Sequence, residues 1–181
     1  MAIREIRYIG DPILRLKAKK VKRFDARLGQ LLDDMAETMM AAPGIGLAAP
    51  QIGVSERVIV VKLAEDENDP QSGKLYEFVN PEIVRAHGEE VGEEGCLSIP
   101  GYTGDVKRAV RITIKAQDRY GRSFRLKAHG LLARVIQHEI DHLEGRLFVD
   151  IAEQLWALVR NEEGETIAVP AEEVVLRQMA A

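Results

Sequence analysis

One stretch of the chain reads Gln137-His138-Glu139-Ile140-Asp141-His142 and contains the pattern H-E-x-x-H. On an α-helix, residues four apart lie on the same face, one turn from each other. His138 and His142 can therefore present two imidazoles to one metal ion, and Glu139 beside them can take a proton from a water molecule on that ion. The alternative is an amphipathic helix that carries two of the chain's four histidines by chance. The pattern favours a metal-binding helix around which the rest of the chain folds.

The sequence on both sides of the motif indicates where this helix begins and ends. Residues 131–136 precede the motif and are a plausible helix, Gly130 is a suitable start, and Gly145 is a suitable stop about one turn after the second histidine. A second helix is predicted over about 25–40, because its apolar residues recur at intervals of three and four. These residues are Leu28, Leu31, Leu32, Met35 and Met39.

Most of the remaining chain has the patterns of short strands. Strands are predicted over 57–63, over 74–79 and 82–86 with a break at Asn80-Pro81, and as hairpins over 105–117 with 123–128 and 155–160 with 166–169. A short helix is expected over 171–178. The order predicts an α+β fold, with mostly antiparallel sheets packed around the helix that carries H-E-x-x-H. No linker divides the chain, so we expect residues 1–181 to form a single domain.

Composition narrows the class of protein. The chain has 181 residues, of which 46% are hydrophobic and 30% charged, as in ordinary globular domains. The formal charge of −4 gives no reason to expect strong nonspecific or specific nucleic-acid binding. No apolar run approaches the ~18–20 residues that span a bilayer, and charges interrupt residues 1–7, so neither a membrane partner nor a signal peptide is expected. With Cys96 as the only cysteine, the expected location is the reducing cytoplasm.

The third metal ligand would decide the chemistry, because hydrolytic metal sites usually have three protein ligands and one open position. In one H-E-x-x-H pattern a third histidine follows, but that position is Phe148. In another the ligand is a glutamate about twenty residues later on a helix; Glu162 lies at that distance, in a segment with the composition of a turn. Cys96 is the remaining candidate, since it lies in a Gly- and Glu-rich segment unlike a core strand.

Three blocks of the sequence together resemble the peptide deformylase family. They are Gly44-Ile45-Gly46-Leu47-Ala48-Ala49-Pro50-Gln51, Glu94-Gly95-Cys96-Leu97-Ser98 and the motif block 137–142, in matching order and spacing. The supporting similarity runs from about residue 6 to residue 150. The resemblance implies a metal-dependent hydrolase that removes the N-formyl group from the N-terminal methionine of nascent polypeptides and releases formate. It also implies one divalent metal ion, typically Fe²⁺, for which Zn²⁺, Ni²⁺ or Co²⁺ can substitute.

The match carries functional roles over to individual positions. It implies that Cys96, His138 and His142 bind the metal, whose bound water becomes the nucleophile. It further implies that Glu139 is the general base and then the acid, and that the side-chain amide of Gln51 and the backbone N–H of Leu97 donate to the developing oxyanion.

The match also implies where the substrate binds. Gly44, Ile45 and Gly46 would pair with the peptide backbone as an added strand. The methionine pocket would be lined by four further residues: Glu94, Leu131, Arg134 and Val135. For Leu131 and Val135 an ordinary core position is an equally good interpretation. Arg134 is unexpected in an apolar pocket, so we expect its aliphatic part to line the wall while its charged end reaches water or Glu94.

Three further residues have weaker support. Tyr102, which follows Pro100-Gly101, is a candidate for the rim of the pocket. Arg108 is a candidate to pair with Asp141 behind the ligands, and a plain surface pair is the alternative.

The C-terminal segment 151–181 departs from the family pattern. Many bacterial members end in a long basic helix that is thought to help docking on the ribosome, whereas this segment has two arginines and six glutamates. RNA phosphate repels such a segment, so transient ribosome contact through it is in doubt.

Two other classes compete with a deformylase. One is a different metallohydrolase, such as a zinc protease or an amidase on another acyl group. The other is a non-catalytic protein with a structural metal, although such sites are usually closed by four protein ligands.

Overall fold

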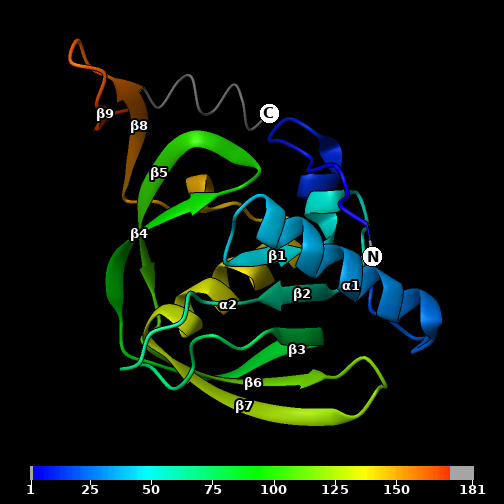
Figure 1. Cartoon of the computed structure of the whole chain (residues 1–181). Helices are drawn as coiled ribbons and strands as arrows, with labels where there is room; N and C mark the ends of the chain where they lie inside the picture. The colour runs from blue at the N-terminus through cyan, green and yellow to red at the C-terminus, as the bar shows by residue number, and fades with distance from the viewer. Residues whose placement is uncertain (1, 172–181) are drawn as a thin grey trace.

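The computed structural model describes residues 2–171, which form two helices and two antiparallel sheets (Figure 1). The helices are α1 (Ala26–Ala41) and α2 (Gly130–Leu143). The five-stranded sheet has the order β1-β2-β3-β6-β7, and its strands are β1 (Gly46–Ala48), β2 (Val58–Val61), β3 (Tyr76–His87), β6 (Arg111–Gln117) and β7 (Ser123–His129). The four-stranded sheet has the order β4-β5-β8-β9, with β4 (Glu90–Cys96), β5 (Ile99–Arg108), β8 (Gln154–Arg160) and β9 (Thr166–Pro170). The predicted α+β class is therefore confirmed.

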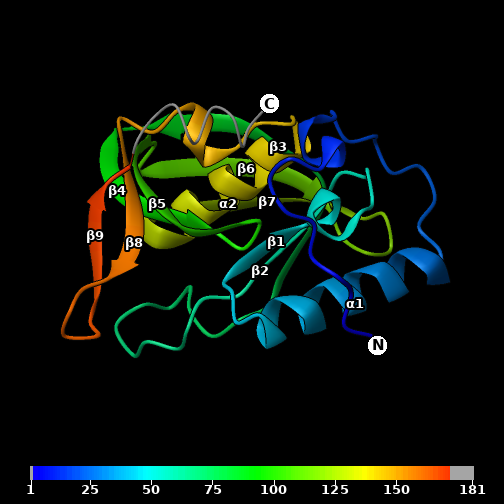
Figure 2. The same ribbon diagram turned by 90° about the horizontal axis from the view of Figure 1, so that it is seen from above.

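Helix α2 lies at the centre of the molecule because it is apolar on several sides. Leu132, Ala133 and Ile136 pack against buried residues of β2, β3 and β6. The first helix covers the opposite side of β1 and β2, where Leu28, Leu32, Met35 and Met39 meet Leu47, Val58 and Val60. Figure 2 shows α1 outside these two strands and α2 between the sheets. The strand β1 is thus held from both sides next to the motif helix.

Both helices have the ends that the sequence predicts. The side chain of Asp25 caps α1 by accepting a hydrogen bond from the backbone N–H of Leu28 at 3.2 Å. Helix α2 begins at Gly130 and is followed by Gly145 with a φ of 74°, a conformation that favours glycine. None of the helices in residues 2–171 has the length and apolar character that crossing a bilayer requires.

Two strand predictions were wrong in detail. Residues 105–117 are not one strand, because β5 ends at Arg108 in one sheet and β6 begins at Arg111 in the other. The side chain of Gln137 holds Ala109 at this crossing, by accepting from its N–H at 3.0 Å and donating to its carbonyl at 2.9 Å. Residues 74–79 and 82–86 are not two strands, because β3 continues through Asn80, which has a φ of 51° at a shift in register.

The C-terminal hairpin is confirmed as β8 and β9, joined by the turn 161–165. Strand β8 pairs with β5 on one side and with β9 on the other, so the hairpin extends the four-stranded sheet (Figure 1). The expected helix over 171–178 lies outside the described residues apart from Ala171.

Candidate metal centre

Three side chains from two elements meet at one point. His138 and His142 lie one turn apart on α2, and Cys96 ends β4. One ligand atom from each lies within 4.8 Å of the others, and Cys96 Sγ is 3.4 Å from His142 Nε2. Glu162 is in the turn between β8 and β9 (Figure 1), away from this cluster. The structure therefore brings together the cysteine and two histidines that the sequence singled out.

The ring of His138 is held by Glu94 on β4. Glu94 Oε1 lies 2.8 Å from His138 Nδ1, which leaves the other ring nitrogen, Nε2, for a metal ion. Arg108 donates to both oxygens of Glu94 at 2.9 Å and to Asp141 at 2.6 Å, and these three side chains are nearly buried. The predicted pair of Arg108 and Asp141 is thus present in a buried network.

Burial and hydrogen bonding shift the pKa of Glu94 and of both histidines. Burial raises the pKa of Glu94, but hydrogen bonds from Arg108 and His138 outweigh it and lower that pKa to about 2. Burial lowers the pKa of His138, whereas its contacts with Cys96 and Glu94 raise it further, to well above the ordinary value. At His142, burial and the nearby His138 both lower the pKa. Glu94 is therefore ionised near neutral pH and can accept a hydrogen bond from His138 Nδ1.

Glu139 is buried beside the three candidate ligands. Its side chain is 3% exposed, and burial raises its pKa to about 7. Glu139 Oε1 lies 3.9 Å from His142 Nε2 and has no hydrogen-bond partner within residues 2–171. A buried carboxyl group with a pKa near neutrality can accept a proton and return it. The donor set and this unpartnered oxygen together fit a bound metal ion with a reacting water.

Gln51 is oriented toward the same point. Its Oε1 accepts from the backbone N–H of Ala48 at 2.9 Å, so its amide nitrogen faces Ser98 Oγ at 3.1 Å and Cys96 Sγ at 3.6 Å. The side chain is almost fully buried. The geometry fixes an N–H donor beside the candidate metal site.

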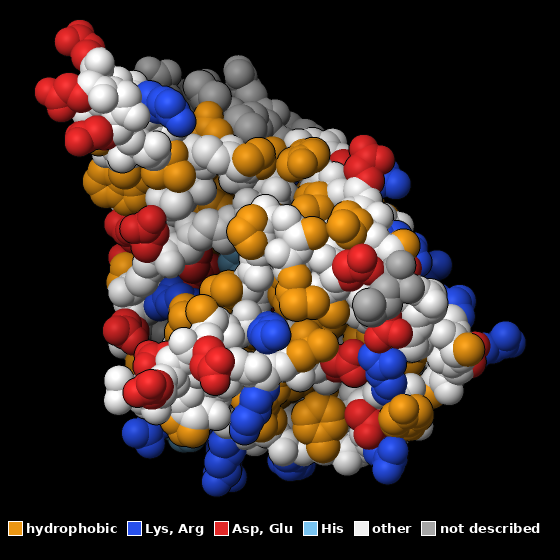
Figure 3. Space-filling view, in the orientation of Figure 1, with side chains coloured by type: hydrophobic (Ala, Val, Ile, Leu, Met, Phe, Trp, Pro, Cys, Tyr) orange, Lys and Arg blue, Asp and Glu red, His pale blue; other side chains and the backbone are white. Residues whose placement is uncertain are grey.

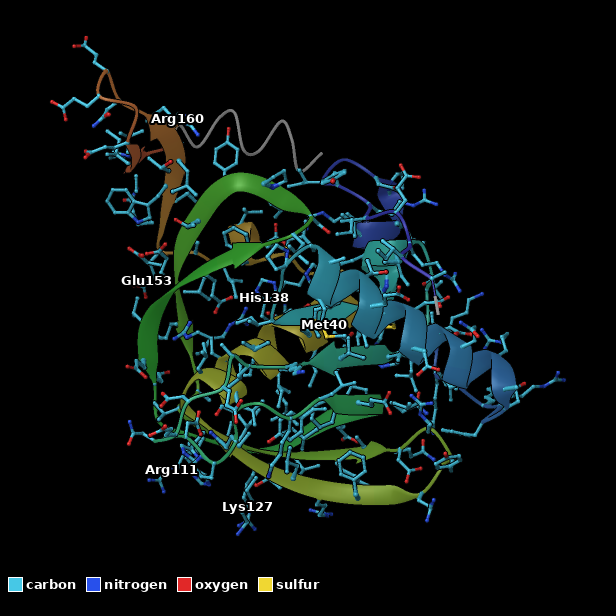
Figure 4. The ribbon with its side chains drawn as sticks, in the orientation of Figure 1. Met40, Arg111, Lys127, His138, Glu153 and Arg160 are labelled. Atoms are coloured by element: carbon cyan, nitrogen blue, oxygen red, sulfur yellow. The ribbon has the colours of Figure 1, made fainter. Side chains whose placement is uncertain are left out.

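A cavity of about 390 Å³ opens next to the cluster. It lies between β1 and β4, which are edge strands of the two sheets. Among its lining residues are all the predicted substrate-binding positions except Tyr102: Gly44, Ile45, Gly46, Glu94, Leu131, Arg134 and Val135. Gln51, Leu97 and Glu139 line it as well. Figure 4 shows His138 near the centre of the molecule, between the two sheets.

Individual lining residues differ from their predictions. Leu131 is 53% exposed and is not a core residue, whereas Val135 is buried. Tyr102 is not among the residues that line the cavity and packs on the separate cluster that includes Ile99 and Phe148, so its place at the rim stays a prediction. The guanidinium of Arg134 reaches Glu94 at 2.7 Å, as expected.

Sequence reasoning missed three residues that shape the site. Ser98 accepts from Gln51 and is fully buried, although its place two residues after Cys96 was a signal. Gln137 fixes the crossing between the sheets. Gly92 leaves room for Arg134, because a Cβ atom there would lie 2.8 Å from Arg134 Cζ. Nothing in the sequence around Gly92 indicates this contact.

Comparisons with known proteins agree with one another. The family model described as polypeptide deformylase matches residues 3–156. Peptide deformylase of Heliobacterium modesticaldum is 55% identical over 153 residues, which are 84% of this chain and 96% of that protein. The corresponding protein of Thermomicrobium roseum is 53% identical over 171 residues, 92% of this chain and 96% of its own.

Solved structures give the same result. A peptide deformylase from Legionella pneumophila superposes with a TM-score of 0.77 at 50% identity, over 84% of this chain and 87% of that one. The enzyme from Synechococcus elongatus in complex with actinonin has a TM-score of 0.76 at 48% identity, over 82% and 80% of the two chains. The family match spans every residue of the cavity between β1 and β4, and on this evidence the chain belongs to the peptide deformylase family.

Proposed function

We propose that Cys96, His138 and His142 hold the divalent metal ion of this hydrolase, which removes the N-formyl group from the N-terminal methionine of newly made polypeptides. The single observation that carries the assignment is the convergence of one thiol and two imidazoles at the wall of the cavity. When bound, the ion lowers the pKa of a water molecule so that hydrolysis proceeds near neutral pH. We propose Fe²⁺ as the resident ion; thiolate and imidazole also suit Zn²⁺, Ni²⁺ and Co²⁺.

Glu139 is the residue we assign to proton transfer. Its pKa of about 7 lets the carboxylate take a proton from the attacking water and then give it to the departing amine. Burial keeps bulk water away from this proton, since the side chain is 3% exposed.

Gln51 and Leu97 are the residues we assign to the developing negative charge on the formyl oxygen. The amide nitrogen of Gln51 is directed by the bond from Ala48, and the backbone N–H of Leu97 follows directly on Cys96. Loss of one such fixed donor costs about 3–4 kcal/mol in the barrier.

The peptide substrate binds along β1 in this proposal. The carbonyl of Ile45 accepts from the N–H of Lys62 at 2.9 Å, so Ile45 faces β2. In an antiparallel pair, the N–H and C=O groups of successive residues point alternately toward and away from the neighbouring strand. The N–H and C=O of Gly46 therefore point away from β2, toward the cavity. An extended formyl-Met peptide can pair with them, while its first side chain lies between Leu131 and Val135.

We also infer that the whole chain acts as one domain, because β8 of the acidic segment 151–181 pairs with β5. Its substrates are nascent chains, so we place the protein in the cytoplasm in transient contact with ribosomes. The two arginines and six glutamates of that segment argue against docking through it.

The test is to purify the protein without oxygen and to measure its metal content. Hydrolysis is then compared for the formyl group of formyl-Met peptides, the acetyl group of acetyl-Met peptides and internal peptide bonds. Cleavage confined to formyl-Met peptides is expected; cleavage of acetylated or internal bonds would instead favour a different amidase or a protease. No turnover in the metal-loaded protein would favour a structural metal. An experimental structure of the loaded protein with Cys96 Sγ beyond about 2.5 Å from the ion would contradict the ligand assignment.

A further inference from the structure

The outer face of the five-stranded sheet carries regularly placed cations. On β6, Arg111 stands opposite His87 and His129, and Thr113 stands opposite Arg85 and Lys127. The intervening residues of β6 point inward and are buried against the core. Cross-strand neighbours of this kind share one face of the sheet. We call five exposed side chains on this side the basic face: Arg85, Arg111, Lys115, Arg125 and Lys127.

The basic face lacks neutralising partners. Within residues 2–171, none of the five side chains has a carboxylate oxygen within 4.0 Å, whereas the nearby Arg119 and Arg122 are both paired. One carboxylate, Glu82, stands in register with the face, opposite Lys115. The five cations and Glu82 together carry a net charge of +4, in a chain whose formal charge is −4. The basic face is therefore positive although the chain as a whole is negative.

A surface hollow of about 460 Å³ lies on this face. It is lined by Arg85, Arg111, Lys127 and both His87 and His129. The acidic loop 64–73 bounds the face, since Gln71 is bonded to the backbone of His129. Figure 3 shows blue side chains along the lower edge of the molecule, where β6 and β7 lie.

We propose that the basic face binds the phosphate backbone of folded RNA. Neighbouring strands lie about 4.8 Å apart and alternate residues of a strand about 7 Å apart, so the cations form a lattice that a repeating polyanion can match. The outward positions of β3, β6 and β7 include no Phe, Tyr or Trp on which unpaired bases would stack, which favours duplex RNA over single strands. Contacts to phosphate would position the protein without reading sequence.

The choice of RNA rests on the proposed function, because nascent chains emerge from a particle whose surface is rich in RNA. The basic face lies on the side of the sheet away from α2, and Figure 4 shows Arg111 and Lys127 directed outward, apart from His138. RNA bound there leaves the substrate cavity open. Strands β8 and β9 of the acidic segment belong to the other sheet, so they need not approach the RNA.

The test measures binding of a fluorescein-labelled RNA hairpin of about 16 base pairs by anisotropy, over a series of salt concentrations. One variant combines Arg111→Ala with Lys127→Ala. A matched control combines Lys107→Ala with Arg160→Ala, which removes the same charge from β5 and β8. We expect the first variant to bind about tenfold or more weakly near 50 mM salt, with the slope of log affinity against log salt reduced by about two units. The control should stay within about twofold of the parent.

Equal weakening in both double variants, or no RNA binding by the parent at low salt, would overturn the proposal. So would equally tight binding of vesicles with anionic lipid, or of polyglutamate, that is lost in the same variant, because the face would then serve a membrane or an acidic protein. Circular dichroism checks that both variants fold. All four substituted side chains lie outside the cavity, so turnover of a short formyl-Met peptide should be unchanged. Absent turnover in the parent would contradict the proposed function. The proposal that the basic face binds RNA is tested by the anisotropy measurements alone.

Discussion

Replacing Gly92 with alanine should displace the guanidinium of Arg134 from the four-stranded sheet. A Cβ atom on Gly92 would lie 2.8 Å from Arg134 Cζ, 2.9 Å from Nη2 and 3.0 Å from Nε. Non-bonded atoms do not approach a Cβ atom this closely, so one group must move. The guanidinium of Arg134 is the end of a flexible side chain and is therefore the group that moves. Arg134 would then lose its bonds to Glu94 at 2.7 Å, to the carbonyl of Val106 at 2.8 Å and to the carbonyl of Glu90 at 2.8 Å.

The expected cost follows from these three bonds. A hydrogen bond from a charged group contributes roughly 1.5–3 kcal/mol to stability. The displaced guanidinium would form hydrogen bonds with water instead, and Glu94 would keep its hydrogen bonds from Arg108. We therefore expect a loss of about 2 kcal/mol for the three bonds together. Replacing glycine with alanine also lowers the conformational entropy of the unfolded chain, which stabilises the folded state by about 0.5 kcal/mol. The net destabilisation is about 1.5 kcal/mol, equivalent to a melting temperature about 3–6 °C lower for a chain of this size.

The assay is a double-mutant cycle in urea with Gly92→Ala, Arg134→Met and the combination. Methionine keeps the apolar stem along the cavity but has no head to collide with the new methyl group. In the Arg134→Met background, Gly92→Ala should therefore cost nothing or stabilise slightly, giving a coupling energy of about 1–2 kcal/mol. The same cost for Gly92→Ala in both backgrounds would refute the steric argument.

Four further outcomes are expected. Glu139→Gln should keep its metal but lose turnover by about 10²–10⁴-fold, because an amide cannot take the proton; near-normal kcat would exclude Glu139 as the base. Cys96→Ala should lower the metal bound per chain at matched chelator concentration, and unchanged metal content would remove Cys96 from the ligand set. Deleting 162–181 should leave kcat/KM on a short formyl-Met peptide within about tenfold, whereas deleting from Glu153 should also lower the urea midpoint, because β8 pairs with β5. Protein reconstituted with Fe²⁺ should lose activity in air faster than protein with Ni²⁺, with oxidation of iron or Cys96 visible by spectroscopy and mass; equal half-lives would contradict this.

The helices and the ligand cluster could be predicted because their signals are local. Apolar spacing of three and four defines α1, and the spacing of four between His138 and His142 is a property of one helix turn. Cys96 was a candidate through its uniqueness, and the fold then brought it 3.4 Å from His142. The roles of Glu139, Gln51 and Leu97 remain predictions.

Features that depend on distant partners were missed. An alternating pattern over 105–117 does not say that its first part belongs to one sheet and its last part to the other. Strand β4 was not predicted because its composition of Glu and Gly is poor for a strand; it forms as the partner of β5, and the buried bonds of Glu94 with Arg108 fix it. Gly92 was overlooked for the same reason, since its contact with Arg134 joins residues 42 positions apart.

The two sheets leave β1 and β4 as edges on either side of the cavity, and β1 has only three residues. In the proposed binding mode, a substrate pairs with this edge through main-chain groups, which every polypeptide has in common. Because β1 is so short, only the first few residues of a substrate would contact the protein. One specificity would then suffice for substrates of many different sequences, because the rest of each polypeptide would make no contact with the site. The same shortness also protects the open edge, since three residues are too few to template a growing aggregate.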